Sequence, residues 1–162
     1  AAYADGNGLL ERLTVEFPRF ADVSDYHGQP VVLYKLGQLC LWSLHVALSG
    51  TGTFAIRDLD HMTAFADYIL PVALEAMEIL EYTDDLVDRI ARKDLISRDS
   101  DQEIEIRAHT IFATAMLADA INAIRPTDRQ VVIPQVDFRL WSTYHAAFPT
   151  LRPHHLTRTT MY

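Results

Sequence analysis

The stretch that decides the fold is SDQEIEIRAHTIFATAMLADAINAI, residues 100–124. Ser100 followed by Glu103 is a capping-box pattern, in which two side chains satisfy backbone N–H groups at the start of a helix. The helix that begins there should run to about Ile124, because Pro126 cannot continue it. The sequence therefore predicts one long helix over these residues.

A second stretch, PVVLYKLGQLCLWSLHVAL at residues 30–48, is apolar on nearly every side. Pro30 suits the first position of a helix, and Ser49-Gly50 is a stop signal. A helix without a polar face normally forms the buried centre of a domain. We therefore expect a central helix over residues 30–48, with Lys35 and Gln38 as its polar exceptions.

The remaining pattern also favours helices separated by short connections. Helices are predicted over about 8–16, from Asp58, from about 69 with Pro71 in the first turn, and from Thr83 or Asp84 to Ala91. Residues 131–136 fit either a short strand or the start of a last helix through Tyr144. Residues 17–29 and 148–162 should be irregular. The expected fold is a single all-α domain over residues 1–162, with orthogonally packed helices.

Composition limits the classes of function. The 162 residues carry a formal net charge of −8, and a surface that acidic repels the phosphate backbone of DNA or RNA. No signal peptide and no membrane-spanning apolar run is present, so we expect a cytoplasmic protein. The chain does not begin with methionine, and residues 1–8 have the composition of a linker. These features suggest a fragment of a longer protein.

Metal and nucleophile motifs are missing from the sequence. Cys40 is the only cysteine, the seven histidines are scattered, and no HExxH pattern occurs. There is no Walker loop, GxGxxG or GxSxG motif. We therefore predict no metal and no cofactor.

Two aspartates stand out for their surroundings. Asp58 follows a Gly-containing linker, where it can cap a helix or place a carboxylate at the mouth of a pocket. Asp67, next to Tyr68, lies between apolar residues. It is either a helix cap or a buried acceptor for N–H groups of a ligand.

The polar residues on the two long predicted helices have both ordinary and functional interpretations. Lys35 and Gln38 are one turn apart and should point the same way. Lys35 can extend to the surface or line a polar pocket. Glu103 and Arg107 have the spacing of an ordinary surface ion pair, which contributes a few tenths of a kcal/mol.

Seven motifs occur in an order that resembles the queuosine-salvage family. They are FPRFADV (17–23), YKLGQ (34–38), RDLDHMTAFADY (57–68), LEYTDDL (80–86), QEIEIRA (102–108), VDFRLW (136–141) and PHHLTRTTMY (153–162). The motifs extend over nearly the whole chain. On these residues the chain is identified as a member of that family and as its C-terminal part.

The resemblance implies a fold like that of the helical DNA glycosylases and hydrolysis of queuosine 5′-phosphate without a metal. The products are queuine, a 7-deazaguanine, and ribose 5-phosphate; the partner is this small nucleotide rather than nucleic acid or a membrane. By position, Asp58 matches the catalytic aspartate, and Asp67 and Tyr68 match residues of the base pocket. The other positions that match polar family residues of the substrate site or its support are Lys35, Gln38, Arg107, His155 and Arg158.

The chain also departs from the family pattern. Ile69 and Val72 replace a common Arg and Gln, and Ser43 stands where an acidic residue is frequent. An N-terminal region that contributes to the pocket is missing. If the protein lacks it, exposed apolar surface should drive oligomerisation or association with a separate chain that supplies it. Two alternatives therefore stay open, a non-catalytic helical binding module and a DNA-repair glycosylase.

Overall fold

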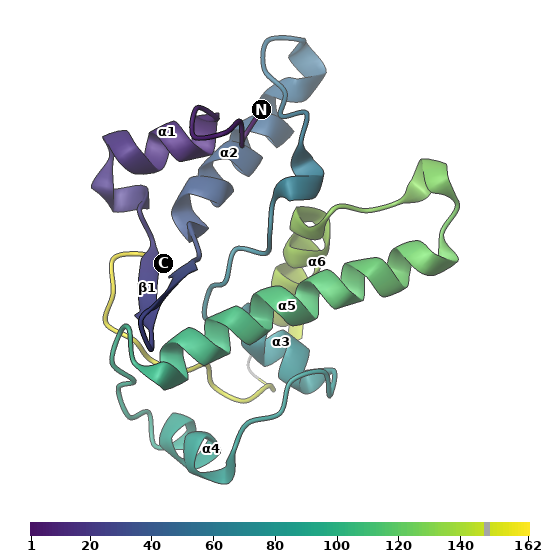
Figure 1. Cartoon of the computed structure of the whole chain (residues 1–162). Coiled ribbons are helices and arrows are strands. Elements are labelled where there is room, and N and C mark those ends of the chain that lie inside the picture. The colour runs from purple at the N-terminus through teal and green to yellow at the C-terminus, as the bar shows by residue number, and fades with distance from the viewer. Residues whose placement is uncertain (148–149) are drawn as a thin grey trace.

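The computed structural model describes residues 1–147 and 150–162. Figure 1 shows α5 crossing the molecule, with α1 and α2 on one side and α4 on the other. The regular elements are α1 (Leu9–Glu16), β1 (Val23–Tyr26), β2 (Gln29–Val32), α2 (Lys35–Leu48), α3 (Leu70–Ala76), α4 (Asp84–Ala91), α5 (Asp101–Ile124) and α6 (Ile133–Ala147), with short 3₁₀ turns at Pro18–Phe20, Ser49–Thr51, Leu59–His61 and Thr127–Arg129.

The long helix α5 confirms the prediction from its capping box. The Ser100 hydroxyl accepts a hydrogen bond from the Glu103 backbone N–H at 3.4 Å, and the Glu103 carboxylate accepts one from the Asp99 N–H at 3.2 Å. These bonds satisfy two N–H groups at the helix start. The helix ends at Ile124, before Pro126.

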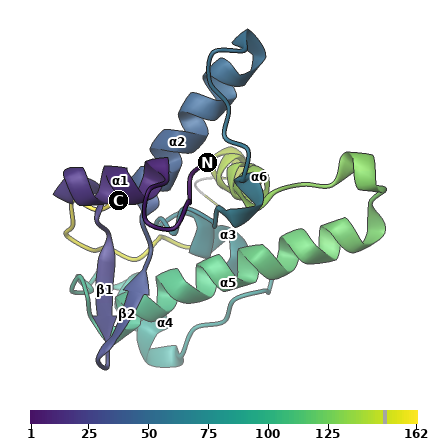
Figure 2. The same ribbon diagram turned by 45° about the horizontal axis from the view of Figure 1, so that its top comes forward.

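The prediction of an all-α fold is wrong over residues 23–32, which form a β-hairpin (Figure 2). His27 and Gly28 occupy its two-residue turn with φ of 52° and 81°, the left-handed pair that matches the twist of a hairpin. Pro30 therefore lies in an edge strand opposite Asp25, where its missing N–H is tolerated. As a result α2 begins at Lys35 rather than at Pro30.

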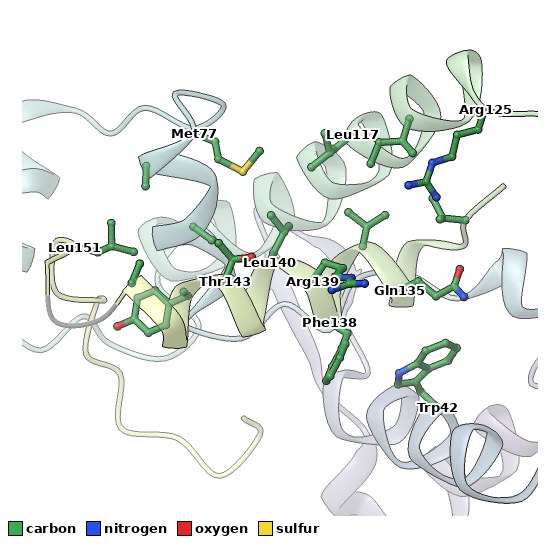
Figure 3. Close-up of a pocket in the computed structure, with 17 residues that line it drawn as sticks. Trp42, Met77, Leu117, Arg125, Gln135, Phe138, Arg139, Leu140, Thr143 and Leu151 are labelled. Carbon is green, nitrogen blue, oxygen red and sulfur yellow. The ribbon is translucent and has the colours of Figure 1, made fainter. Parts of the chain in front are cut away.

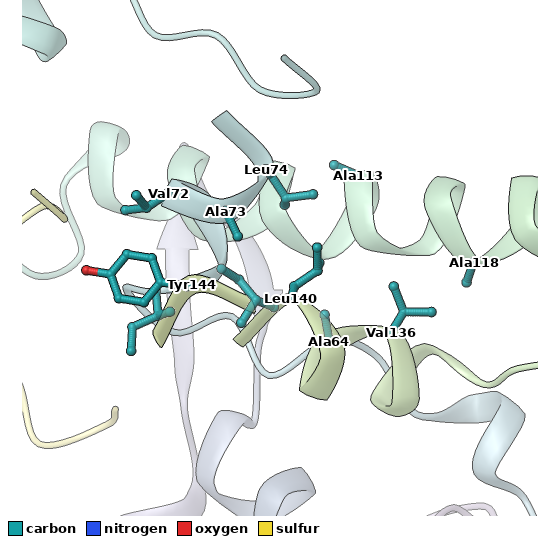
Figure 4. Packing of buried hydrophobic residues seen from close by; sticks show 11 residues of the cluster. Ala64, Val72, Ala73, Leu74, Ala113, Ala118, Val136, Leu140 and Tyr144 are labelled. Atoms are coloured by element: carbon teal, nitrogen blue, oxygen red, sulfur yellow. The ribbon is translucent and has the colours of Figure 1, made fainter. Parts of the chain in front are cut away.

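The largest buried cluster lies where α3, α5 and α6 meet (Figure 4). Leu74, Ala113 and Leu140 represent the three helices in it. Ile69 and Val72 are also buried there, which gives these two departures from the family pattern a packing role. A second cluster joins α1 to α2 around Leu10, whose Cδ1 would lie 2.6 Å from a Cβ at Gly37.

The other predicted elements are partly confirmed. Residues 131–132 precede α6 and residues 133–136 begin it, so this stretch forms no strand. The helix predicted from Asp58 is a single 3₁₀ turn. The tail over residues 150–162 is irregular except for an isolated bridge between Leu95 and Leu156; Phe148 and Pro149 lie outside the described residues. Within the described part, no helix combines the length and the apolar character that a membrane-spanning helix needs.

Candidate active site

A cavity of about 630 Å³ between α2 and α6 collects the chemically useful side chains. Its walls carry two carboxylates, one ammonium group and four aromatic rings. The lining residues are Lys35, Leu39, Trp42, Ser43, Val46, Ala47, Phe65, Asp67, Asp137, Phe138 and Trp141. Large aromatic faces with a few convergent polar groups are typical of a site for a small planar ligand.

Asp67 reaches this cavity from the segment that precedes α3. Its Oδ1 accepts hydrogen bonds from the backbone N–H groups of Ile69 at 2.8 Å and Leu70 at 3.0 Å. The sequence left a helix cap and a ligand acceptor as alternatives for this residue. The structure combines the cap with a place in the cavity wall.

Asp137 on α6 is the second carboxyl group of the cavity and is only 4% exposed. One of its oxygens accepts the Phe65 backbone N–H at 2.7 Å. Burial raises the pKa of Asp137 to about 7; the Phe65 N–H opposes this rise, Asp67 adds to it, and Lys35 opposes it. A carboxyl group with a pKa near neutrality can hold or give up a proton under physiological conditions.

This raised pKa predicts a pH-dependent cost to folding. Between the ordinary aspartate pKa of about 3.9 and the folded value, only the folded state keeps the proton, so the stabilisation by Asp137 is lost as pH rises through about 7. From pH 5 to pH 8 the loss should be roughly 2 to 3 kcal/mol. Asp137→Asn should remove that part of the pH dependence, measured by urea unfolding of both proteins at the two pH values. Equal pH dependence in the two proteins would contradict the buried, protonated carboxyl.

Asp58 is not among the described residues that line this cavity. Its two oxygens accept backbone N–H groups of Ala2 at 2.8 Å and Tyr3 at 2.9 Å. Burial disfavours the charged form, but these hydrogen bonds leave the pKa of Asp58 below its ordinary value. The carboxylate therefore ties residues 2–3 to the start of the Leu59–His61 turn, and its catalytic role stays a prediction.

Gln38 and Tyr68 are not brought into the cavity with Lys35 and Asp67. Gln38 is buried and exchanges hydrogen bonds with Thr63, donating to its hydroxyl and accepting its backbone N–H, both at 2.8 Å. Tyr68 is partly exposed and packs its ring 4.5 Å from His154. Both residues connect the segment before α3 to other parts of the chain.

Arg107 and Glu103 correct the expectation of a surface ion pair, because they are 1% and 0% exposed. The Arg107 guanidinium donates to both oxygens of the buried Asp22, to Glu103 at 3.5 Å, and through Nε to the Ala66 carbonyl at 3.0 Å. The Tyr162 ring lies over it, with its centroid 4.3 Å from Cζ. Arg107 is not among the described residues that line the cavity.

The two remaining predicted residues lie in the tail. His155 is 2% exposed, and burial, with further effects from His154 and Arg107, lowers its pKa to about 4. A histidine that is neutral at pH 7 supplies no positive charge to a phosphate. Arg158 is exposed. Neither residue lines the Asp67 cavity.

A larger hollow of about 820 Å³ lies on the other side of α6 (Figure 3). Trp42 and Phe138 border both hollows, but the larger one has no acidic residue among its described lining. Its other walls are mostly apolar, with Met77, Leu117 and Leu140 as examples. We therefore locate the candidate chemistry in the smaller cavity, where the carboxyl groups are.

The pattern of one protein family matches residues 1–162, and that family is described as "Queuosine salvage protein". The chain belongs to the queuosine salvage protein family. It is 36% identical over 162 residues to a protein of Sphaerobacter thermophilus, covering 100% of this chain and 49% of the relative. It is 32% identical over 154 residues to one of Dictyostelium discoideum and 26% over 160 to one of Mus musculus, each time covering 95% of this chain and 47% of the relative.

All three relatives are named queuosine 5′-phosphate N-glycosylase/hydrolase. The chain spans about half the length of these relatives. Two residues that the structure makes prominent, Asp22 and Asp137, were not selected from the sequence. Both stand in motifs that carried the resemblance, FPRFADV and VDFRLW, and their signal was an acidic residue within an apolar motif.

Proposed function

We propose that the protein hydrolyses the N-glycosidic bond of queuosine 5′-phosphate, at the cavity between α2 and α6. The observation that carries this proposal is the buried Asp137 carboxyl group, with its pKa near 7, in one aromatic-lined cavity with Asp67 and Lys35. A charged and a protonatable carboxyl group are the pair that glycosidic hydrolysis uses. The names of the relatives supply the substrate class.

In the proposed reaction, Asp67 acts in its ionised form. It stabilises the positive charge that develops on the ribose as the bond between C1′ and the base nitrogen breaks, and it accepts the proton that the attacking water releases. The water oxygen forms the new bond to C1′. The bonding electrons leave with the base, and a proton from Asp137 neutralises the departing nitrogen.

Lys35 is the candidate cation for the substrate, because it is the one basic residue among the described residues that line the cavity. Its ammonium group can pair with the 5′-phosphate. The aromatic rings of Trp42, Phe138 and Trp141 provide flat apolar surfaces for a deazaguanine base. Tyr68, Gln38, Arg107 and His155 would support this site from the surrounding structure.

Two observations support the presence of a partner polypeptide. The chain spans about half the length of its relatives, and an apolar hollow lies beside α6. Large apolar side chains that line this hollow are exposed, with Phe138 at 56% and Met77 at 49%. We propose that a polypeptide equivalent to the remaining half of the relatives covers this hollow, whether it belongs to the same chain or to another one. Because Trp42 and Phe138 border both hollows, this cover would also complete one wall of the site.

The test is release of free queuine from queuosine 5′-phosphate, followed by chromatography, with the chain alone and with the N-terminal half of the Sphaerobacter relative added. We expect release by the mixture, and faster release than by the chain alone. No release by the mixture, when the intact relative is active in the same assay, would favour a non-catalytic binding module. The acidic net charge argues against a DNA-repair role. The cytoplasmic location and the fold like that of the DNA glycosylases stay predictions.

A further inference from the structure

The segment that carries Asp67 is anchored at three consecutive residues. The Phe65 N–H donates to Asp137, the Ala66 carbonyl accepts from Arg107, and the Asp67 carboxylate caps α3. Ala66 has φ of 38°, a left-handed conformation that a residue with a Cβ rarely adopts. A backbone of this kind persists only where its surroundings hold it in place.

Arg107 is the side chain that holds the backbone at Ala66 in place. Its Nε bond to the Ala66 carbonyl is 3.0 Å long, and its other nitrogens bind Asp22 and Glu103. Because both acids are buried, the guanidinium has a fixed position and a fixed direction.

Tyr162 also packs against the Arg107 guanidinium. Its ring stacks on the guanidinium, and its hydroxyl donates to Glu103 at 2.9 Å. The residues that fix Arg107 therefore come from three distant parts of the sequence: Asp22 precedes β1, Glu103 is on α5, and Tyr162 is in the tail. Figure 1 shows the tail returning to the region of β1.

We propose that Arg107 is a positioning residue, which sets the direction of the Asp67 carboxylate toward Asp137 by holding the Ala66 carbonyl. The proposal rests on the function proposed above for the cavity. It assigns no contact with substrate to Arg107, since this residue does not line the cavity and is 1% exposed. Tyr162 acts one step further away, by holding Glu103 and the guanidinium plane.

The test measures the pKa of Asp137 by NMR titration of its side-chain carboxyl carbon, which requires no turnover. Lysine at position 107 keeps a positive charge but not the fork that binds Asp22 and Ala66 together. In Arg107→Lys the residue 65–67 segment should relax, Asp67 should move away, and water should enter. Burial is the largest cause of the raised pKa of Asp137, so the entry of water should lower this pKa by about one unit or more, although a weaker Phe65 N–H bond acts in the opposite direction. Lys35, the other charged group near Asp137, is unchanged in this variant.

Two further variants separate positioning from general destabilisation. Tyr162→Phe keeps the ring and removes the hydroxyl, which donates to Glu103 and also interacts with Thr157, so it should fold and shift the Asp137 pKa in the same direction by a smaller amount. Ile104→Val changes a buried residue of α5 outside the network and should lower the melting temperature without moving this pKa. If the Asp137 pKa shifts in Arg107→Lys and Tyr162→Phe but not in Ile104→Val, the proposal is supported, even if none of these proteins releases base. If the Asp137 pKa is unchanged in whichever of Arg107→Lys and Tyr162→Phe folds, the proposal is overturned.

Discussion

Asp67→Asn is expected to lower the rate of base release by at least about a hundredfold, because general acid–base or electrostatic help from one carboxylate has that magnitude. Asparagine keeps an Oδ1 that can accept the N–H groups of Ile69 and Leu70, so the cap of α3 should survive. The loss should therefore appear in the rate, while the melting temperature changes little. Chromatography of released queuine measures the first and thermal unfolding the second.

Asp58→Asn is the matched comparison, since it makes the same chemical change at the aspartate first predicted to be catalytic. Its carboxylate binds the backbone of Ala2 and Tyr3 outside the cavity. We expect its rate of release to stay within a few-fold of the unmodified protein, with some loss of stability. A hundredfold loss in Asp58→Asn together with an active Asp67→Asn would reverse the two assignments.

Arg107→Met should produce a large loss of stability. Removing the guanidinium leaves Asp22 and Glu103 buried without their cation, and breaking a buried ion pair in this way costs about 3–5 kcal/mol. Equilibrium unfolding in urea should show this loss, or the variant should fail to fold.

The control for that prediction is Arg12→Met. Arg12 pairs with Glu16 one turn along α1, and both side chains are more than half exposed. Such a pair contributes at most about 1 kcal/mol. If Arg107→Met were no more destabilising than Arg12→Met, the buried network would not have the role assigned to it.

Most of the helices could be predicted because their signals are local. The capping box at Ser100, Pro71 in the first turn of α3, and the start of α4 after Thr83 all act within a few residues of the chain. The hairpin was missed because its signal competes with a stronger one. Pro30 before an apolar run favours a helix start, and the turn at His27 and Gly28 has no common hairpin dipeptide.

The candidate site could be predicted only in part, for a different physical reason. Lys35 and Asp67 were selected, and the structure places both in the cavity wall. Asp137 depends on contacts with residues about 70 positions away, and local spacing contains no information on them. The same holds for Arg107, whose pairing with Asp22 across 85 positions turns an apparent surface residue into a buried one.

The most direct test of the central claim uses the two tryptophans of the chain, Trp42 and Trp141, which both line the cavity. Their indole N–H signals can be followed by NMR while queuine is added. If the base binds between α2 and α6, both signals should shift in a saturable way. Saturable shifts elsewhere in the spectrum, with both indole signals unmoved, would show that the base binds outside this cavity and would contradict the proposed site.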